Sequence, residues 1–160
     1  MVHKIQVLIL FLLVPFLGLY LYAKSQDIPF REIFAPGTPV LHINEIPMTI
    51  EIVSSQAART KGLSGRSEMR TDGMLFVFDT SDYHGIWMKD MLFAIDIIWV
   101  DESLKVVGVE RGVRPDSYPR SFRPSVPAKY AIETKDGYTE TFSVSVGDTV
   151  RLPLQLDSKK

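Results

Sequence analysis

Charged side chains inside otherwise apolar segments are the residues of this 160-residue chain that point to chemistry. Asp96 stands within residues 93–100, where every other side chain is apolar. Because side chains alternate along a strand, Asp96 shares a face with Ile98 and Val100, and its carboxylate points into a core or a pocket. A buried carboxylate without a partner is costly, so it needs a hydrogen-bond donor or keeps its proton. The candidate donors are the cations Arg59, Arg66 and Lys89.

A wider group of residues extends this hypothesis to a binding site. Arginine suits such a site because a planar guanidinium binds a carboxylate through two hydrogen bonds. Trp87 either packs in the core or forms a platform for a sugar or another ring. The alternative for the charged residues is a set of ion pairs that only maintain the fold. The candidate ligand-binding residues are Arg59, Arg66, Trp87, Lys89, Asp96 and Glu133.

Composition and motifs exclude several classes of chemistry. The chain has no cysteine, which excludes disulfides, iron–sulfur clusters and a cysteine nucleophile. Its three histidines are far apart, and neither a zinc-ligand spacing nor a phosphate-binding loop occurs. Arg66 follows Gly62-Leu63-Ser64-Gly65, in the place where a serine hydrolase motif has its second glycine. Because these motifs are missing, we expect no metal and no cofactor. The net charge of −1 gives no reason to expect a nucleic-acid partner.

Short strands separated by turn residues must position these groups. A single short helix is predicted over residues 55–61, with Ser55 as its N-cap and Gly62 at its end. Residues 110–127 contain four prolines and are predicted to form an irregular loop. This pattern predicts a mostly β fold, a small β-sandwich or barrel-like domain with one short helix. The predicted strands are 40–44, 48–53, 74–78, 85–89, 93–101, 105–109, 129–134, 142–146 and 150–154.

The N-terminal segment predicts insertion into a membrane or export across it. Residues 7–23 carry no charge, and the apolar stretch from residue 5 spans roughly 28 Å as a helix, close to the hydrocarbon thickness of a bilayer. Lys4 before it favours a cytoplasmic N-terminus, which leaves the rest of the chain outside the cytoplasm. A cleavable signal peptide ending near Ala23-Lys24-Ser25 is the alternative, and the domain is then secreted. We therefore predict a transmembrane anchor or signal peptide over 1–25, a linker over 26–39 and an extracytoplasmic β domain over 40–157.

Several motifs occur in a characteristic order between residues 40 and 152. They are Arg59-x-x-Gly62-Leu63-Ser64-Gly65-Arg66, Asp72-Gly73-Met74-Leu75-Phe76-Val77-Phe78, Trp87-Met88-Lys89, Asp96-Ile97-Ile98, Pro127-Ala128-Lys129-Tyr130-Ala131-Ile132-Glu133 and Val146-Gly147-Asp148. This series resembles the domain of unknown function 192 family. The chain departs from that family at Ala94-Ile95, where a Pro-Leu pair is usual, and at the turn after Glu133. The resemblance implies a compact, mostly β domain, often exported or membrane-anchored, and implies no reaction.

Three functional hypotheses follow. The first is a membrane-tethered, extracytoplasmic binding module for a small anionic or sugar-like ligand. The second is a structural or protein-interaction domain whose charged residues hold the fold together. The third is an envelope hydrolase or lyase that uses Asp96 and Glu133 as acid and base. We favour the binding module and assign no catalytic residue.

Overall fold

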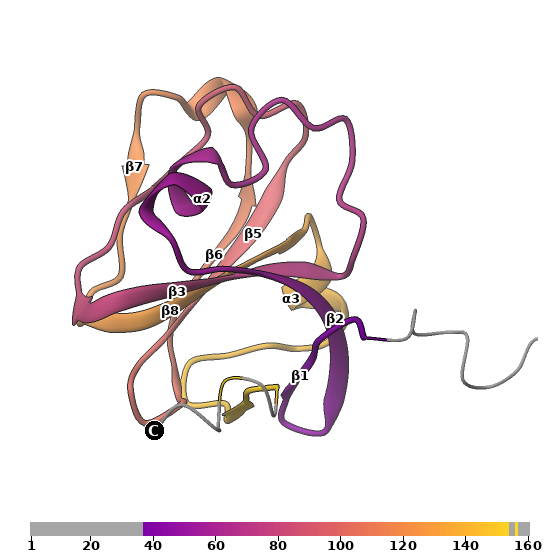
Figure 1. The fold of residues 1–160 in the computed structure, drawn as a ribbon, viewed down its shortest axis with the longest axis vertical. Coiled ribbons are helices and arrows are strands. Elements are labelled where there is room, and N and C mark those ends of the chain that lie inside the picture. Colours follow the sequence, from indigo (N-terminus) through magenta and orange to yellow (C-terminus); the bar gives the residue numbers. More distant parts are fainter. Residues whose placement is uncertain (1–36, 154–155, 157–160) are drawn as a thin grey trace, which may run out of the picture. The chain divides into compact units, whose positions relative to one another are not determined.

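The computed structural model describes residues 37–153 and 156, which form a mostly β domain (Figure 1). Seven strands form a curled, half-barrel sheet in the order β6-β5-β8-β3-β2-β1-β9, and β4 pairs with β7 separately. The strands are β1 (Val40–Ile43), β2 (Ile46–Val53), β3 (Gly73–Asp82), β4 (Ile86–Trp87), β5 (Ile95–Val100), β6 (Val106–Val113), β7 (Ser121–Phe122), β8 (Ala128–Lys135) and β9 (Val150–Arg151). The helical segments are α2 (Gln56–Lys61), η1 (Pro115–Ser117) and α3 (Tyr138–Thr141).

The predicted anchor over 1–25 and residues 26–36 of the predicted linker lie outside the described residues. Within the described part of the chain, no helix is both long enough and apolar enough to cross a membrane.

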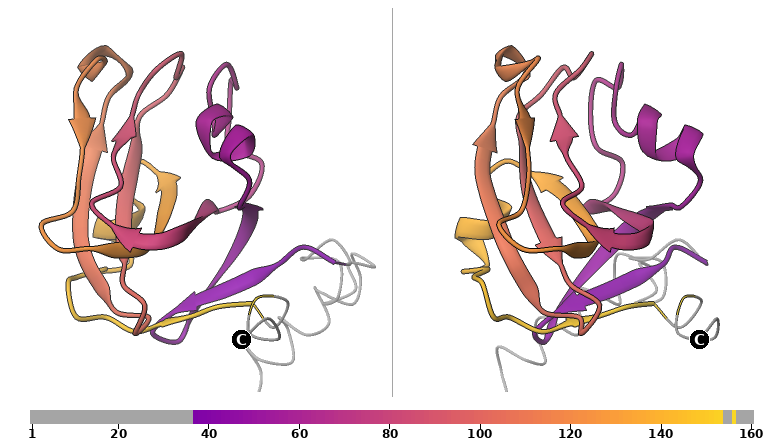
Figure 2. Two further views of the ribbon diagram at one scale, coloured as in Figure 1. Left: turned by 60° about the vertical axis from the view of Figure 1, so that its left-hand side comes forward. Right: turned by 90° about the vertical axis from the view of Figure 1, so that its left-hand side faces the viewer.

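The central strands bury apolar side chains on both faces. Residues 95, 97 and 99 of β5 belong to a core that also contains Phe76 and Phe78 of β3. Residues 98 and 100 belong to a second core, inside the curl of the sheet, with Leu75 of β3. Helices α2 and α3 lie on opposite sides of the sheet (Figure 2). The predicted strand over residues 74–78 is confirmed as part of β3, and its apolar side chains are covered on both faces of the sheet.

The two ends of the curled sheet meet through backbone contacts. Lys105, just before β6, forms an antiparallel bridge with Thr149, just before β9. The N–H of Val106 donates to the carbonyl of Asp148 over 2.9 Å, and the N–H of Val150 donates to that of Leu104 over 2.8 Å. These bonds satisfy backbone groups that would otherwise remain unpaired at the sheet edges.

Helix α2 lies in the crossover between β2 and β3, which pair in parallel. Ser55 caps the helix, since its Oγ accepts a hydrogen bond from the N–H of Ala58 over 3.2 Å. Gly62 follows the last helical residue with a φ of +45°, a conformation that favours glycine. The predicted helix and both of its boundaries are confirmed, and they place Arg59 and Lys61 in the last turn.

Two local predictions are wrong. The alternating pattern of residues 142–146 does not form a strand, because α3 ends just before it and only Val144 enters the core while Val146 is 66% exposed. Residues 110–127 are also more regular than predicted. Strand β6 continues to Val113 beside β5, and β7 pairs with β4.

We expect Gly73→Ala to destabilise the domain by about 1–3 kcal/mol, because the added methyl group overpacks the contact between β3 and β8. A Cβ at this position would lie 2.9 Å from the carbonyl oxygen of Glu133 and 3.1 Å from the sulfur of Met48. Urea unfolding measures the effect. Ser67→Ala, at an exposed position, is the control and should change the free energy of unfolding by less than about 0.5 kcal/mol. Equal stability of the two variants would contradict the predicted packing.

Candidate functional site

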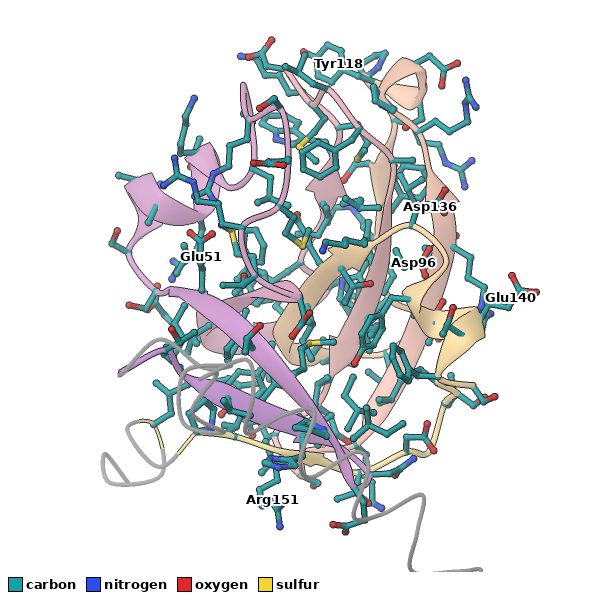
Figure 3. The ribbon with its side chains drawn as sticks, turned by 90° about the vertical axis from the view of Figure 1, so that its right-hand side faces the viewer. Glu51, Asp96, Tyr118, Asp136, Glu140 and Arg151 are labelled. Carbon is teal, nitrogen blue, oxygen red and sulfur yellow. The ribbon has the colours of Figure 1, made fainter. Side chains whose placement is uncertain are left out.

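Asp96 is a fully buried carboxylate with three hydrogen-bond donors. Its Oδ1 accepts from the N–H of Gly112 over 2.9 Å. Its Oδ2 accepts from the N–H of Thr139 over 2.9 Å and from the hydroxyl of Thr139 over 2.7 Å. The expectation that Arg59, Arg66 or Lys89 supplies the donors is wrong, because Asp96 points to the face that α3 covers. Asp96 therefore anchors α3 and β6 to strand β5 (Figure 3).

The two candidate arginines form ion pairs with Glu51 and Asp79, neither of which is among the predicted site residues. Arg66 binds Glu51 of β2 through two hydrogen bonds of 2.6 and 3.0 Å, and this pairing raises the pKa of Arg66. Arg59 donates to Asp79 over 2.8 Å and to the carbonyl of Val77 over 2.9 Å, which ties α2 to β3. Asp79 is exposed, so the attraction between its carboxylate and Arg59 is partly screened by water.

Glu133 is a buried carboxyl group with an unpaired oxygen in the described part of the chain. It is 5% exposed, and its Oε2 has no hydrogen-bond partner among the described residues. Its position on β8 pairs with Met74 of β3, which in turn pairs with Glu51, so these side chains form a row across one face. Burial raises the pKa of Glu133 to about 8, while the positive charge of Arg66 lowers it in part. Glu133 therefore carries a proton at neutral pH.

A cavity of about 200 Å³ lies between α2 and the strands, with Glu133 in its lining. Its walls combine apolar side chains with polar and charged ones, and they include Trp87, which is 49% exposed. A shallower hollow adjoins the cavity and shares Lys61 and Trp87 with it. The cavity is lined by Gln56, Arg59, Thr60, Lys61, Gly62, Leu63, Ser64, Phe76, Phe78, Gly85, Ile86, Trp87, Met91 and Glu133.

The structure brings together part of the predicted set. Arg59, Trp87 and Glu133 line the cavity, and Lys89 lines the adjoining hollow. Arg66 acts on Glu133 through its charge, although its hydrogen bonds go to Glu51. Asp96 lies apart from the others, on the opposite face of the sheet.

Trp87 and Met88 point in opposite directions, as the alternation of a strand predicts. Met88 is 1% exposed, whereas Trp87 contacts Tyr118 edge to face, with the ring centroids 6.2 Å apart. The hypothesis that Trp87 belongs to the core is therefore wrong, and its ring is available at the cavity.

The positions of Asp96 and Glu133 argue against the hypothesis that they act as the acid and base of a hydrolase or lyase. Asp96 pairs in register with Thr134, and Glu133 pairs with Ile97, so the two carboxyl groups point to opposite faces of the sheet. They cannot act on the two sides of one bond.

Other cavity residues were not identified from the sequence. Phe76 and Phe78 lie on a strand, where apolar residues are first explained as core, and neither Lys61 nor Met91 belongs to a recognisable motif. Glu51 did give a signal, since it is a charged residue alternating with apolar ones along residues 48–53. Its partner was not predictable, because Arg66 reaches it from a loop after α2.

These features define a class: a mostly β domain with a half-barrel sheet and a cavity of mixed polar and apolar lining beneath its short helix. The chain belongs to the domain of unknown function 192 family (DUF192, described as "Uncharacterized ACR"), whose family model matches residues 40–152. The resemblance seen in the sequence is thereby confirmed.

Two solved structures share the fold. A protein of unknown function from Novosphingobium aromaticivorans is 24% identical, with a TM-score of 0.65 over 71% of this chain and 83% of its own. A putative transcription regulator from Sinorhizobium meliloti is 22% identical, with a TM-score of 0.67 over 72% of this chain and 94% of its own. At such identities the likeness shows the fold alone. No curated protein matches the chain.

We expect Asp96→Asn to lower the free energy of unfolding by about 2–3 kcal/mol, because an amide nitrogen cannot accept the hydrogen bonds that Asp96 receives. Urea unfolding measures this loss. Asp136→Asn, at an exposed position nearby, is the matched control. A loss no larger than that of the control would contradict the anchoring role of Asp96.

Glu133→Gln is expected to change how stability depends on pH. The folded wild type keeps the proton of Glu133 up to about pH 8, whereas the unfolded chain releases it near pH 4.5. The folded state therefore binds more protons between these values, and wild-type stability falls as the pH rises through this window, by about 1.4 kcal/mol per unit at most. An amide side chain does not titrate, so the variant gains stability over the wild type from pH 5 to pH 8. Parallel urea-unfolding profiles of the two proteins would contradict the raised pKa.

Proposed function

We propose that this chain is a membrane-tethered, extracytoplasmic binding module for a small ligand, and that the cavity beneath α2 is its binding site. The observation that carries the proposal is the Oε2 atom of Glu133, which is buried in the cavity lining without a hydrogen-bond partner among the described residues.

A buried polar atom without a partner destabilises the domain, and a ligand group in the cavity supplies the missing partner. Trp99 Nε1 and the Tyr138 hydroxyl are also buried without partners in the described part of the chain, but neither residue lines the cavity. Glu133 therefore differs from them in having space beside it. Apolar walls with a few convergent polar groups are the usual composition of a small-molecule site.

Trp87 provides a second element of recognition. Its ring is about half exposed at the cavity, and it also borders the adjoining hollow with Lys61 and Lys89. An exposed aromatic ring buries a large apolar area against a ligand and stacks on other rings. Together with Glu133, it supports a ligand with an apolar or ring-shaped body and at least one polar group.

The tether is supported by the sequence. The apolar segment within 1–25 has the length of a transmembrane helix, and the linker over 26–39 separates it from the domain over 40–157. The domain then lies outside the cytoplasm and remains attached to the membrane through the N-terminal helix. Mass spectrometry of the mature N-terminus distinguishes the uncleaved anchor from a signal peptide, in which case the domain is secreted.

The binding function is tested with the full chain in detergent by following unfolding through intrinsic tryptophan fluorescence. A panel of organic acids, amino acids and cell-wall sugars is screened for compounds that raise the melting temperature. A ligand at 100 times its dissociation constant stabilises by about 2.7 kcal/mol, which corresponds to a shift of several degrees.

The expected result is a shift that Glu133→Leu and Trp87→Ala each reduce. The matched controls, Glu140→Leu and Tyr83→Ala, replace exposed residues that do not line the cavity and should keep the full shift. Ligands that stabilise the wild type and the cavity variants equally would contradict the assigned site. A panel without any stabilising compound would favour the structural or interaction domain instead.

A further inference from the structure

We propose that the ligand of this cavity is a small carboxylate with a ring-sized apolar body, and that its carboxylate oxygen accepts a hydrogen bond from the protonated carboxyl group of Glu133. This inference rests on the proposed function, because it names the class of compound that the same cavity binds.

The charges around Glu133 favour an anion. Arg66, from the loop after α2, is the charged group that acts on Glu133, and it is paired with Glu51 of β2. Arg59 and Lys61 of α2 line the same cavity. Arg66 is neutralised by Glu51, and Arg59 is paired with Asp79. Lys61 has no ion-pair partner within the described part of the chain, so the cavity lining has an uncompensated positive charge.

The adjoining hollow adds to this field. Its lining includes Lys61, Lys89 and Trp87, with Asp90 as its single acidic residue. The side chain of Lys89 likewise has no ion-pair partner among the described residues. An anionic ligand is therefore attracted toward the cavity entrance, and a cationic one is repelled from it.

The protonated carboxyl group of Glu133 can donate a specific hydrogen bond to an anionic ligand that these positive charges attract. Two carboxyl groups can lie side by side only when they share a proton, because two negative charges at that distance repel strongly. Burial raises the pKa of Glu133 to about 8, so its O–H is available as a donor at neutral pH. A hydrogen bond from a neutral carboxyl group to an ionised carboxylate is short and charge-assisted, stronger than one to a neutral oxygen.

The walls select the rest of the ligand. Phe76 and Phe78 of β3 and Ile86 of β4 line the cavity, with Met91 and Leu63 completing the apolar surface. A ligand with a flat apolar body of the size of one ring places no polar group against these apolar side chains. The cavity volume of about 200 Å³ suits a body of the size of one ring, and a larger ligand extends past Trp87 into the adjoining hollow of about 740 Å³.

The opposite hypothesis is an amine, which binds the ionised form of Glu133. It makes the opposite prediction for pH, since its affinity increases as Glu133 loses its proton. A neutral amide or alcohol is the third class, and its affinity depends little on the positive charge of Lys61.

Isothermal titration calorimetry of the full chain in detergent with benzoate, benzamide and benzylamine separates the three classes. For the wild type, benzoate should bind most tightly of the three at pH 6.5, and its affinity should fall about tenfold per pH unit above pH 8. Titrations at pH 8.5 in buffers of different ionisation enthalpy should show proton uptake when benzoate binds.

Two variants test the assigned contacts. Glu133→Gln keeps a hydrogen-bond donor but cannot titrate, so benzoate should bind with the same affinity from pH 6.5 to 9.5 and without proton uptake. Lys61→Gln should weaken benzoate by about fivefold while leaving benzamide unchanged, the effect expected of one partly exposed charge. Arg151→Gln, on β9 and away from the cavity, is the control and should change neither affinity.

The results that would overturn this inference differ from those that would overturn the proposed binding function. Tighter binding of benzylamine, with an affinity that increases with pH, would replace the carboxylate by an amine and keep the cavity as a binding site. If benzoate bound the wild type and Glu133→Gln equally at every pH, the proton of Glu133 would play no part in ligand binding. If no compound from this series or from the screening panel binds, the proposed binding function itself fails.

Discussion

Residues 95–100 of β5 and 130–134 of β8 are buried on both faces, and this constraint decides what happens to the carboxyl groups that they carry. A carboxyl group in either segment must find hydrogen-bond donors inside the protein or remain protonated. Asp96 has three hydrogen-bond donors, from Gly112 and Thr139. Glu133, on the neighbouring strand and on the other face, remains protonated instead.

The difference follows from what covers each face. Inside the curl, the sheet closes on itself through Lys105 and Thr149, and α3 brings backbone and hydroxyl donors directly to Asp96. The other face is covered by separate short pieces: α2, the loop after it, and the β4–β7 pair. Such pieces do not fill the volume above the sheet completely, and the cavity beside Glu133 is the space that they leave.

Local structure was predictable from the sequence, whereas the partners of the charged residues were not. The cap residue Ser55, the helix end at Gly62 and the orientation of Asp96 each depend on neighbours within a few residues, and all were predicted. Thr139 lies 43 residues from Asp96, and Asp79 lies 20 residues from Arg59. These contacts depend on strand order, with β8 inserted between β3 and β5, and nothing in the local pattern specifies that order. The strand wrongly predicted over residues 142–146 has the same origin, because its alternation does not show whether a neighbouring strand is available.

The two buried carboxyl groups also differ in what they contribute to stability, and this difference separates fold from site. A carboxylate with three donors holds distant segments together, so Asp96 is explained by the fold alone. Glu133 keeps an oxygen beside the cavity that no described residue pairs with, which lowers stability, and a leucine of similar size would pack there without that loss. Residues that cost stability are characteristic of functional sites, where the group is needed for something other than folding. By this reasoning Glu133, rather than the better bonded Asp96, is the residue around which a function for this domain should be sought.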